Sequence, residues 1–243
     1  MAKAAWWTAP RTEVLPLQEA FCVRFAEQGY RMAALPALVA VAALVWAWWA
    51  GAAVVAWWTA AVAAGVAAAV LLFFRDPERE DPGGEHVVVS PADGRVVAVA
   101  ETESGHPLDP GRRRRVSVFM SPLNVHINRI PAAGVVEDIS YHQGRFRAAY
   151  GEDASEVNEA NAILLAATTG YRYVVVQIAG WLARRIVCTV ERGQRVGRGE
   201  RLGLIMFGSR LDLFLPLELT VKVSKGQRVK AGSTVIADKG APR

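Results

Sequence analysis

The sequence predicts a mainly β protein whose β domain is preceded by an α-helical membrane hairpin. From Met32 to Phe74 there is no charged residue, and this run is about twice the ~20 residues that span a bilayer once. After it come short runs rich in Val and Ile, separated by Gly and Pro, a spacing typical of all-β sandwiches and barrels. The expected domains are therefore an N-terminal interfacial segment (1–31), the membrane hairpin (32–74) and a catalytic β domain (75–243).

Tryptophans in the middle of the apolar run indicate that the run turns back. They stand on either side of Gly51, at Trp46, Trp48, Trp49, Trp57 and Trp58. Tryptophan prefers the membrane–water interface, so we expect one helix over 33–50 and a second over 52–74. A hairpin that dips into one leaflet without crossing remains the alternative. A buried helix pair of a soluble domain is disfavoured, because a soluble core pair rarely lacks charge over such a length.

Basic residues flank both ends of the hairpin and predict its orientation. Arg24 and Arg31 precede the apolar run, and Arg75 and Arg79 follow it. By the positive-inside rule both ends are cytoplasmic, which places the β domain on the cytoplasmic side of the cell membrane. A cleaved signal peptide is disfavoured because the apolar run is too long and begins too late. The two cysteines are too few for a disulfide scaffold and indicate a reduced compartment.

An internal repeat indicates the architecture of the β domain. The stretches "TVERGQRVGRGERLGLI" and "KVSKGQRVKAGSTVIAD" share Gly-Gln-Arg-Val and stand about 33 residues apart. Such alternation of strand residues with glycine turns resembles the barrel-sandwich hybrids of biotinyl and lipoyl carrier domains. A carrier presents a lysine at a hairpin tip, whereas the stretch between the two copies offers Gly208-Ser209-Arg210. The β domain is therefore expected to be barrel-sandwich-hybrid-like, without support for a carrier function.

Three residues are candidates for a reactive site. Ser209 lies within the apolar stretch "LIMFGSRLDLFLP", where a glycine before it marks a bulge, a close backbone approach or a hairpin turn. His126 lies between a hydrophobic strand and a proline-bounded turn, the type of position where functional residues gather. Asp93 lies in "SPADGRVV", where Asp-Gly is also a common turn sequence. The three residue types fit a nucleophile, a base and an orienting acid.

Other chemistries lack their motifs. The sequence has no G-x-S-x-G elbow and no H-E-x-x-H pattern, so a simple hydrolase and a zinc peptidase are disfavoured and no metal is expected. It also has no phosphate loop and no dinucleotide fingerprint. The four arginines 112–115 fit a solvated basic loop that can contact anionic lipid, and no nucleic-acid partner is expected.

Five stretches together resemble the phosphatidylserine decarboxylase family, in its short prokaryotic branch with an N-terminal hairpin. They are "RDPER", "SPADGRVV", "SPLNVHINRIP", "VVQIAG...ARRIV" and "RGERLGLIMFGSRLDLFLP". The resemblance runs from about Met32 to Lys230, and "FGSR" with its flanks is its most specific part. The longer branch has Leu-Gly-Ser-Thr in place of this Phe-Gly-Ser-Arg, and a second histidine where this chain has Arg129. No role is therefore carried over to Arg129.

The resemblance implies that the chain cuts itself between Gly208 and Ser209 and that Ser209 becomes a covalent pyruvoyl group. Ser209 Oγ would attack the Gly208 carbonyl, His126 would take the proton, and Asp93 would orient His126. The pyruvoyl ketone would form a Schiff base with the serine amine of the lipid and accept electrons as carbon dioxide leaves, which gives phosphatidylethanolamine.

The expected partners are the membrane and a phospholipid substrate, with the pieces 1–208 and 209–243 remaining associated. A second copy of the chain, as a homodimer, is left open. Two other functions also remain as alternatives. A membrane-tethered carrier-like β module would leave the chain uncut, and a Ser-His-Asp hydrolase would keep Ser209 as a serine.

Overall fold

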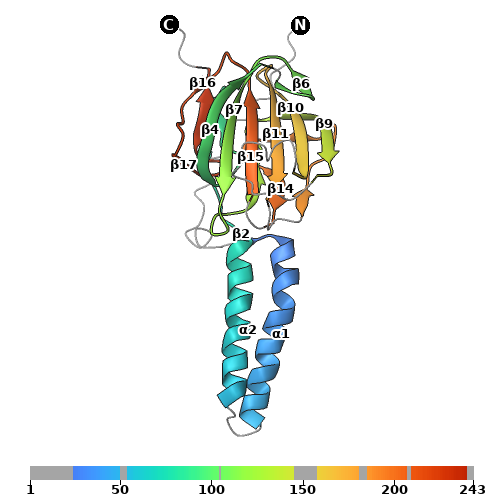
Figure 1. Ribbon diagram of the computed structural model, residues 1–243, viewed down its shortest axis with the longest axis vertical. Coiled ribbons are helices and arrows are strands. Elements are labelled where there is room, and N and C mark those ends of the chain that lie inside the picture. Colours follow the sequence, from blue (N-terminus) through green and yellow to red (C-terminus); the bar gives the residue numbers. More distant parts are fainter. Residues whose placement is uncertain are drawn as a thin grey trace, which may run out of the picture.

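The computed structural model describes residues 24–49, 54–103, 105–144, 158–180, 185–206 and 209–239. In it, a β domain stands at one end of a helical hairpin, as Figure 1 shows. The mainly β fold with an N-terminal helical hairpin is thereby confirmed. Most of the expected interfacial segment 1–31, the turn at Gly51 and the expected cleavage residue Gly208 lie outside the described residues.

The hairpin consists of α1 (Glu27–Trp49) and α2 (Val54–Phe73). Alanines line the contact between the two helices, namely Ala33, Ala40, Ala43 and Ala47 of α1 and Ala56, Ala60, Ala63 and Ala67 of α2. Small residues of this kind let membrane helices approach closely. The large side chains point outward, with Trp48 and Trp49 more than four-fifths exposed (84% and 82%). Both helices are long and apolar enough to cross a bilayer, and an apolar outer face is typical of helices that contact lipid.

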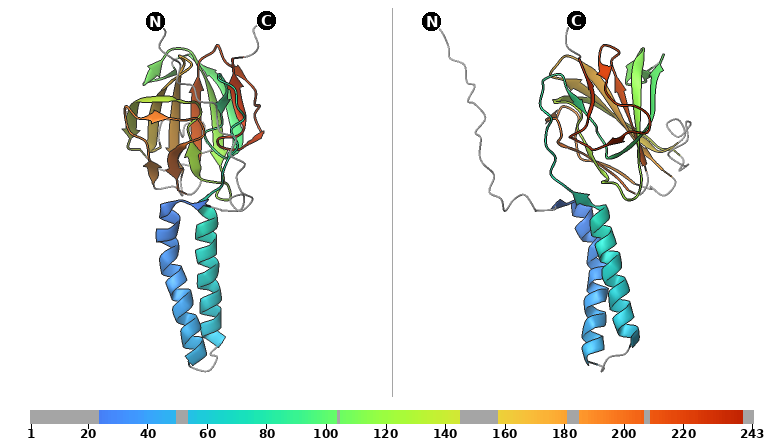
Figure 2. Two further views of the ribbon diagram at one scale, coloured as in Figure 1. Left: turned by 180° about the vertical axis from the view of Figure 1, so that it is seen from behind. Right: turned by 90° about the vertical axis from the view of Figure 1, so that its left-hand side faces the viewer.

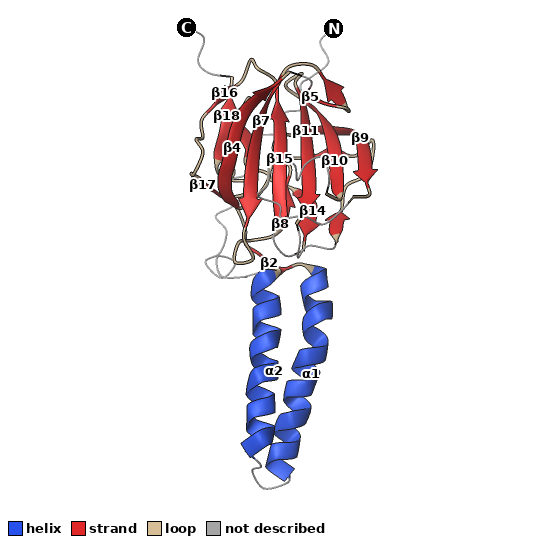
Figure 3. Cartoon of the chain, viewed as in Figure 1, coloured by secondary structure: helices blue, strands red, loops and turns tan. Residues whose placement is uncertain are grey.

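The β domain is built on one eight-stranded sheet and two three-stranded sheets (Figure 3). The large sheet has the order β13 (Arg195–Val196), β9 (Gly134–His142), β10 (Ala160–Ala167), β11 (Arg172–Ala179), β15 (Ser209–Leu215), β7 (Arg113–Met120), β4 (Gly94–Thr102), β17 (Arg228–Val229). One small sheet has β12 (Ile186–Cys188), β14 (Arg201–Ile205) and β8 (Ile127–Arg129); the other has β16 (Thr220–Val221), β18 (Val235–Asp238) and β3 (Val88–Val89). The remaining pairs are β1 (Arg24–Phe25) with β2 (Arg75–Asp76) and β5 (Gly105–His106) with β6 (Asp109–Pro110).

The main hydrophobic core lies on the inner face of the curled eight-stranded sheet (Figure 2). Along β15, Leu211, Leu213 and Leu215 belong to this core, whereas Phe214 belongs to a second cluster. Successive side chains of a strand point to opposite faces, so both faces of β15 are covered. All seven residues of β15 are buried, and its two charged residues, Arg210 and Asp212, pair with each other on the face opposite to this core.

The two Gly-Gln-Arg-Val repeats belong to two halves related by an approximate two-fold axis. The strand that contains the first repeat, β13, pairs with β9 at one edge of the large sheet, and β17 with the second repeat pairs with β4 at the other edge. Reciprocal backbone hydrogen bonds join the halves, from Val89 N to Pro131 O and from Arg129 N to Pro91 O, both 2.9 Å. The duplication thus extends to "HVVVSPADG" (86–94) and "HINRIPAAG" (126–134).

The duplication gives the two candidate residues in these stretches a counterpart each in the other half. Asp93 occupies the position that Ala133 has in the other half, and His126 has His86 as its counterpart. The glycine that follows is required in both halves. A Cβ added to Gly94 would lie 2.1 Å from Phe119 O, and one added to Gly134 would lie 2.1 Å from Ala166 O.

The hairpin is joined to the β domain by a small apolar cluster and by ion pairs. Phe73 and Phe74 at the end of α2 pack against the β-domain residues Val125, Ile127 and Leu204. This cluster continues the β domain into the last turn of α2, two residues before the boundary expected from the sequence at residue 75.

A buried carboxylate secures the same junction. Asp76, only 2% exposed, accepts hydrogen bonds from Arg129 of β8 and from Arg201 of β14. The guanidinium of Arg75 donates to Leu72 O and to Leu123 O, at 2.6 and 2.7 Å. The chain that leaves the hairpin is therefore tied to β8, to β14 and to the turn before His126.

A truncated chain that begins at residue 75 should be less stable than one that begins at residue 70. Phe73 and Phe74 are 8% and 2% exposed, and burial of each is worth about 2 kcal/mol. We expect a loss of about 4 kcal/mol in the free energy of unfolding, measured by urea titration of both truncated chains. Equal stability would contradict a structural role of the junction cluster.

Candidate active site

Ser209 is the first residue of β15 and is fully buried (0% exposed). It pairs with Met120 of β7 on one side and with Ala179 of β11 on the other. The sequence reads as one interrupted strand, but the structure has two. The chain runs along β14 in a three-stranded sheet and then enters the eight-stranded sheet at Ser209. Ser209 therefore stands at the point where the chain enters the eight-stranded sheet.

His126 follows a tight turn at the end of β7 and is 1% exposed. Its Nδ1 lies 2.9 Å from Asn124 O. A carbonyl oxygen only accepts, so Nδ1 carries the proton and Nε2 keeps a free lone pair. Within the part of the chain that the structure describes, Nε2 has no hydrogen-bond partner. Burial lowers the pKa of this imidazole to about 4, opposed by the bond to Asn124, while nearby Arg75 lowers it further.

The turn before His126 is fixed from several sides. Asn124 Oδ1 accepts from the backbone N and the Oγ of Ser121, at 2.9 and 2.7 Å. An asparagine that bonds its own turn in this way stabilises the loop without a partner elsewhere. The ring of Phe73 stacks on the imidazole with a centroid distance of 4.0 Å and an interplanar angle of 27°. The imidazole is thus held between this turn and the last turn of α2.

Asp93 makes its hydrogen bonds elsewhere. Its Oδ2 accepts from Arg79 at 2.9 Å, and its Oδ1 accepts from Ala231 N at 2.8 Å. Burial raises the pKa of this carboxyl, and both partners oppose the rise. Among the described hydrogen bonds none joins Asp93 to His126, whose ring is oriented by Asn124 instead. The structure therefore places Asp93 in the loop contact between the two repeat-bearing halves.

Four side chains near Ser209 were not expected from the sequence. Ser209 Oγ and Asn128 Nδ2 both lie 3.6 Å from Met120 Sδ. Asn128 is further linked to Gln177, and Gln177 to Asn161. A signal was present in the sequence, because Gln177 and Asn161 interrupt the otherwise apolar strands "YVVVQIAG" and "NAILLAA". A buried polar residue on the core face of a strand is more informative than an exposed apolar one.

Arg129 and Arg210 both have structural partners. Arg129 donates to Asp76 at 2.6 Å and to Gly199 O at 2.8 Å, and burial lowers its pKa. Arg210 lies on the face of β15 opposite to Ser209 and binds Asp212 with two nitrogens, at 2.7 and 2.9 Å. Both guanidiniums are thereby paired with carboxylates.

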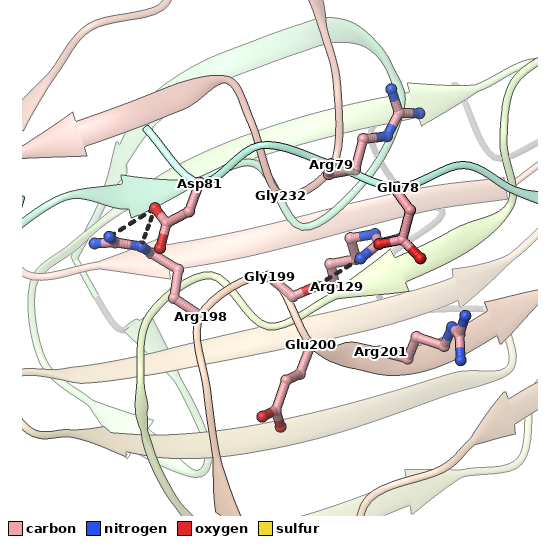
Figure 4. A pocket seen from close by; sticks show the side chains of 9 residues that line it. All are labelled: Glu78, Arg79, Asp81, Arg129, Arg198, Gly199, Glu200, Arg201 and Gly232. Atoms are coloured by element: carbon pink, nitrogen blue, oxygen red, sulfur yellow. Dashed lines mark hydrogen bonds and ion pairs between the residues drawn. The ribbon is translucent and has the colours of Figure 1, made fainter. Parts of the chain in front are cut away.

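A surface cleft of about 340 Å³ lies between the segments that carry Arg79, Gly199 and Gly232 (Figure 4). Its lining side chains are mostly charged, and they include Glu78, Arg79, Asp81, Arg129, Arg198, Glu200 and Arg201. Ser209 and His126 do not line this cleft. Its charges largely neutralise one another, as in the pair of Asp81 and Arg198 at 2.7 Å. In the described ranges no group of His, Cys, Asp and Glu side chains is arranged to hold a metal.

The fold and the site together define a mainly β protein with an apolar helical hairpin, a buried serine that is a nucleophile candidate, and a buried neutral histidine beside the end of the hairpin. The family model of phosphatidylserine decarboxylase matches residues 66–237. The chain is 49% identical over 162 residues to a phosphatidylserine decarboxylase proenzyme of Syntrophus aciditrophicus, covering 67% of this chain and 76% of that protein. It is 50% identical over 167 residues to the proenzyme of Gluconobacter oxydans, covering 68% and 74%. The chain belongs to the phosphatidylserine decarboxylase family.

The imidazole of His126 should stay neutral far below the usual pH of histidine titration. Its pKa is lowered from 6.5 to about 4, so Nε2 remains unprotonated across pH 5.5–8.5. A ¹⁵N NMR titration of the detergent-solubilised protein measures this directly, with the signal assigned by its loss in His126→Gln. Protonation near pH 6.5 would show that the ring is exposed to water.

Proposed function

We propose that the chain decarboxylates phosphatidylserine to phosphatidylethanolamine with a pyruvoyl group formed from Ser209. One observation carries the assignment of this residue. Ser209 is completely buried at the start of a strand, and in the described part of the chain its hydroxyl donates a hydrogen bond to a thioether. A serine with only a structural role would normally bond a backbone carbonyl or a stronger acceptor.

In the proposed self-cleavage, Ser209 Oγ attacks the Gly208 carbonyl carbon. The peptide C–N bond breaks, an ester forms, and the amino group of residue 209 becomes free. Neutral His126 is the proposed base, because its Nε2 lone pair is free and stays unprotonated at neutral pH. Glycine at 208 leaves the carbonyl open to attack, since it has no side chain.

Elimination then releases Gly208 as a carboxylate and leaves an enamine at residue 209. Hydrolysis of this enamine releases ammonia and produces the ketone. The described side chains next to Ser209 fit this group, because Ala179, Met120 and, beyond Met120, Asn128 are small, apolar or amide side chains. When present, a pyruvoyl group supplies an electron sink for decarboxylation without a metal. The chain's own contribution is to exclude water and to hold the imidazole of His126 neutral.

The two pieces are proposed to stay together after the cut. β15 pairs with both β7 and β11, and β18 pairs with β3 of the other piece. Separation would therefore break ladders on both sides of a fully buried strand. Within the piece 209–243, β15 therefore remains an internal strand of the large sheet.

The membrane hairpin is proposed to hold the site at the lipid headgroups, with the β domain on the cytoplasmic side. Phe73 at the end of α2 contacts His126 directly, so the site lies where the apolar helix ends. A lipid headgroup stays at this level of the bilayer, and tethering raises its effective concentration.

The full chain should appear as two pieces in its mature form. Mass spectrometry under denaturing conditions should detect 1–208 and a piece 209–243 without a free amino terminus. Ser209→Ala should leave the intact 26.3 kDa chain, because no hydroxyl remains to attack. A folded wild-type chain that stays intact would rule out the pyruvoyl assignment. Reaction of that intact chain with acyl-serine probes would favour a hydrolase.

His126→Gln and Asp93→Asn should differ in how strongly they slow the cut. Loss of a general base costs about 10²–10⁴-fold in rate, so His126→Gln should accumulate uncut chain. Asp93→Asn should slow the cut less, about tenfold or below, because Asp93 binds Arg79 and Ala231 N and not the imidazole. Gel analysis of pulse-labelled chain measures both rates. An equal, large loss in both variants would indicate that Asp93 moves to the imidazole during cleavage.

A further inference from the structure

The interior of the β domain near Ser209 contains a continuous chain of side-chain hydrogen bonds. Asn161 Nδ2 donates to Gln177 Oε1 at 3.0 Å, and Gln177 Nε2 donates to Asn128 Oδ1 at 2.9 Å. Asn128 Nδ2 then lies 3.6 Å from Met120 Sδ, which also accepts from Ser209 Oγ at 3.6 Å. We call Asn161, Gln177 and Asn128 the amide relay.

We propose that the amide relay fixes the Met120 thioether, and that the thioether positions the Ser209 hydroxyl for self-cleavage. The relay residues and Met120 are positioning residues in this proposal, which rests on the self-cleavage proposed above. It adds the acceptor that orients the nucleophile before the base acts.

The burial of these groups shows that the arrangement is costly. Asn128, Gln177, Met120 and Ser209 are 0% exposed and Asn161 is 3% exposed. Burying amides in a core costs free energy unless every polar group finds a partner. Apolar side chains of similar size would fill the same space without this cost. The relay stands at the Ser209 end of the sheet, next to the core cluster on its inner face, which consists of apolar side chains.

The sulfur determines the direction of the whole relay. A thioether has no hydrogen to donate, so Asn128 must turn its Nδ2 toward Met120. Its Oδ1 then faces Gln177, which must present Nε2, and Gln177 Oε1 in turn accepts from Asn161. A change in the hydrogen-bonding character of residue 177 should therefore alter how Asn128 contacts Met120 Sδ, although Gln177 does not touch the sulfur.

A thioether suits the task of holding a nucleophile that a different group deprotonates. It accepts weakly and is not a base at any relevant pH. It can therefore orient the Ser209 O–H and leave an oxygen lone pair free to attack. A carboxylate in its place would hold the proton tightly and add a buried charge.

Met120→Leu tests the role of the sulfur, since this swap conserves volume. The chain is made by cell-free synthesis with phosphatidylglycerol/phosphatidylethanolamine vesicles, pulse-labelled, and followed on gels. Loss of a weak hydrogen bond should slow the cut about fivefold. Met206→Leu, the same substitution three residues before Ser209, is the matched control and should cleave within about twofold of wild type.

Gln177→Glu tests the relay through its pH dependence. A neutral carboxyl still donates to Asn128 Oδ1 and accepts from Asn161, whereas the ionised form only accepts. Burial raises the pKa of such a carboxyl, so this variant should cleave near the wild-type rate at pH 5.5 and at least about tenfold more slowly at pH 8.5. Wild type should show no such dependence, because His126 stays neutral over this range. Gln177→Leu, which cannot donate, should be slow at both pH values.

The outcomes separate the positioning role proposed here from the self-cleavage on which it rests. A folded wild-type chain that never cuts removes the proposed self-cleavage. Wild type that cuts while Met120→Leu cuts equally fast, or Gln177→Glu that is independent of pH, overturns the positioning role alone. Circular dichroism at both pH values checks folding of each variant. If Gln177→Glu unfolds at pH 8.5, the rate of Met120→Leu decides.

Discussion

The antiparallel pairing of β15 with both of its neighbours is the constraint on which the rest of the molecule depends. It places Ser209 between Met120 of β7 and Ala179 of β11, so that a residue at the start of a strand is nevertheless fully enclosed. The same pairing puts Ser209 on the inner face, beside the amide relay, and Arg210 on the other face. A register shift of one residue would exchange these faces.

A second set of contacts, at one end of this sheet, determines the position of the hairpin. The last turn of α2 contributes Phe73 to the environment of His126, and Asp76 binds arginines from β8 and β14. The last turn of α2 therefore forms part of the surroundings of His126. The hydropathy of the sequence indicates two domains, but at this junction the hairpin and the β domain pack against each other.

The approximate two-fold symmetry gives two halves with the same backbone pattern and different side chains. The two halves share the backbone hydrogen bonds of their repeats, and a glycine is required at the same place in each. They differ in the side chains that face the interior. Asp93 replaces the alanine found at Ala133, and Asn128 is the counterpart of Val88. The two halves therefore share one backbone arrangement and differ in the polar side chains that they carry.

The sequence by itself determined the hairpin, the β character and the paired repeats. An uncharged run such as 32–74 is compatible with few environments, regularly spaced glycines mark turns, and β-branched residues favour strands. Ser209 and His126 stood out for the same reason, as polar residues at breaks between apolar strands.

Only the tertiary structure decided which polar side chains meet. Asp93 was expected beside His126, yet its carboxylate binds Arg79 and Ala231 N. Asn128, Gln177 and Asn161 were overlooked, yet they form a chain of hydrogen bonds that ends at Met120. These residues lie on four different strands, β8, β11, β10 and β7. No local pattern records which inward-facing residues of separate strands face one another, because strand order and register are set by packing of the whole core.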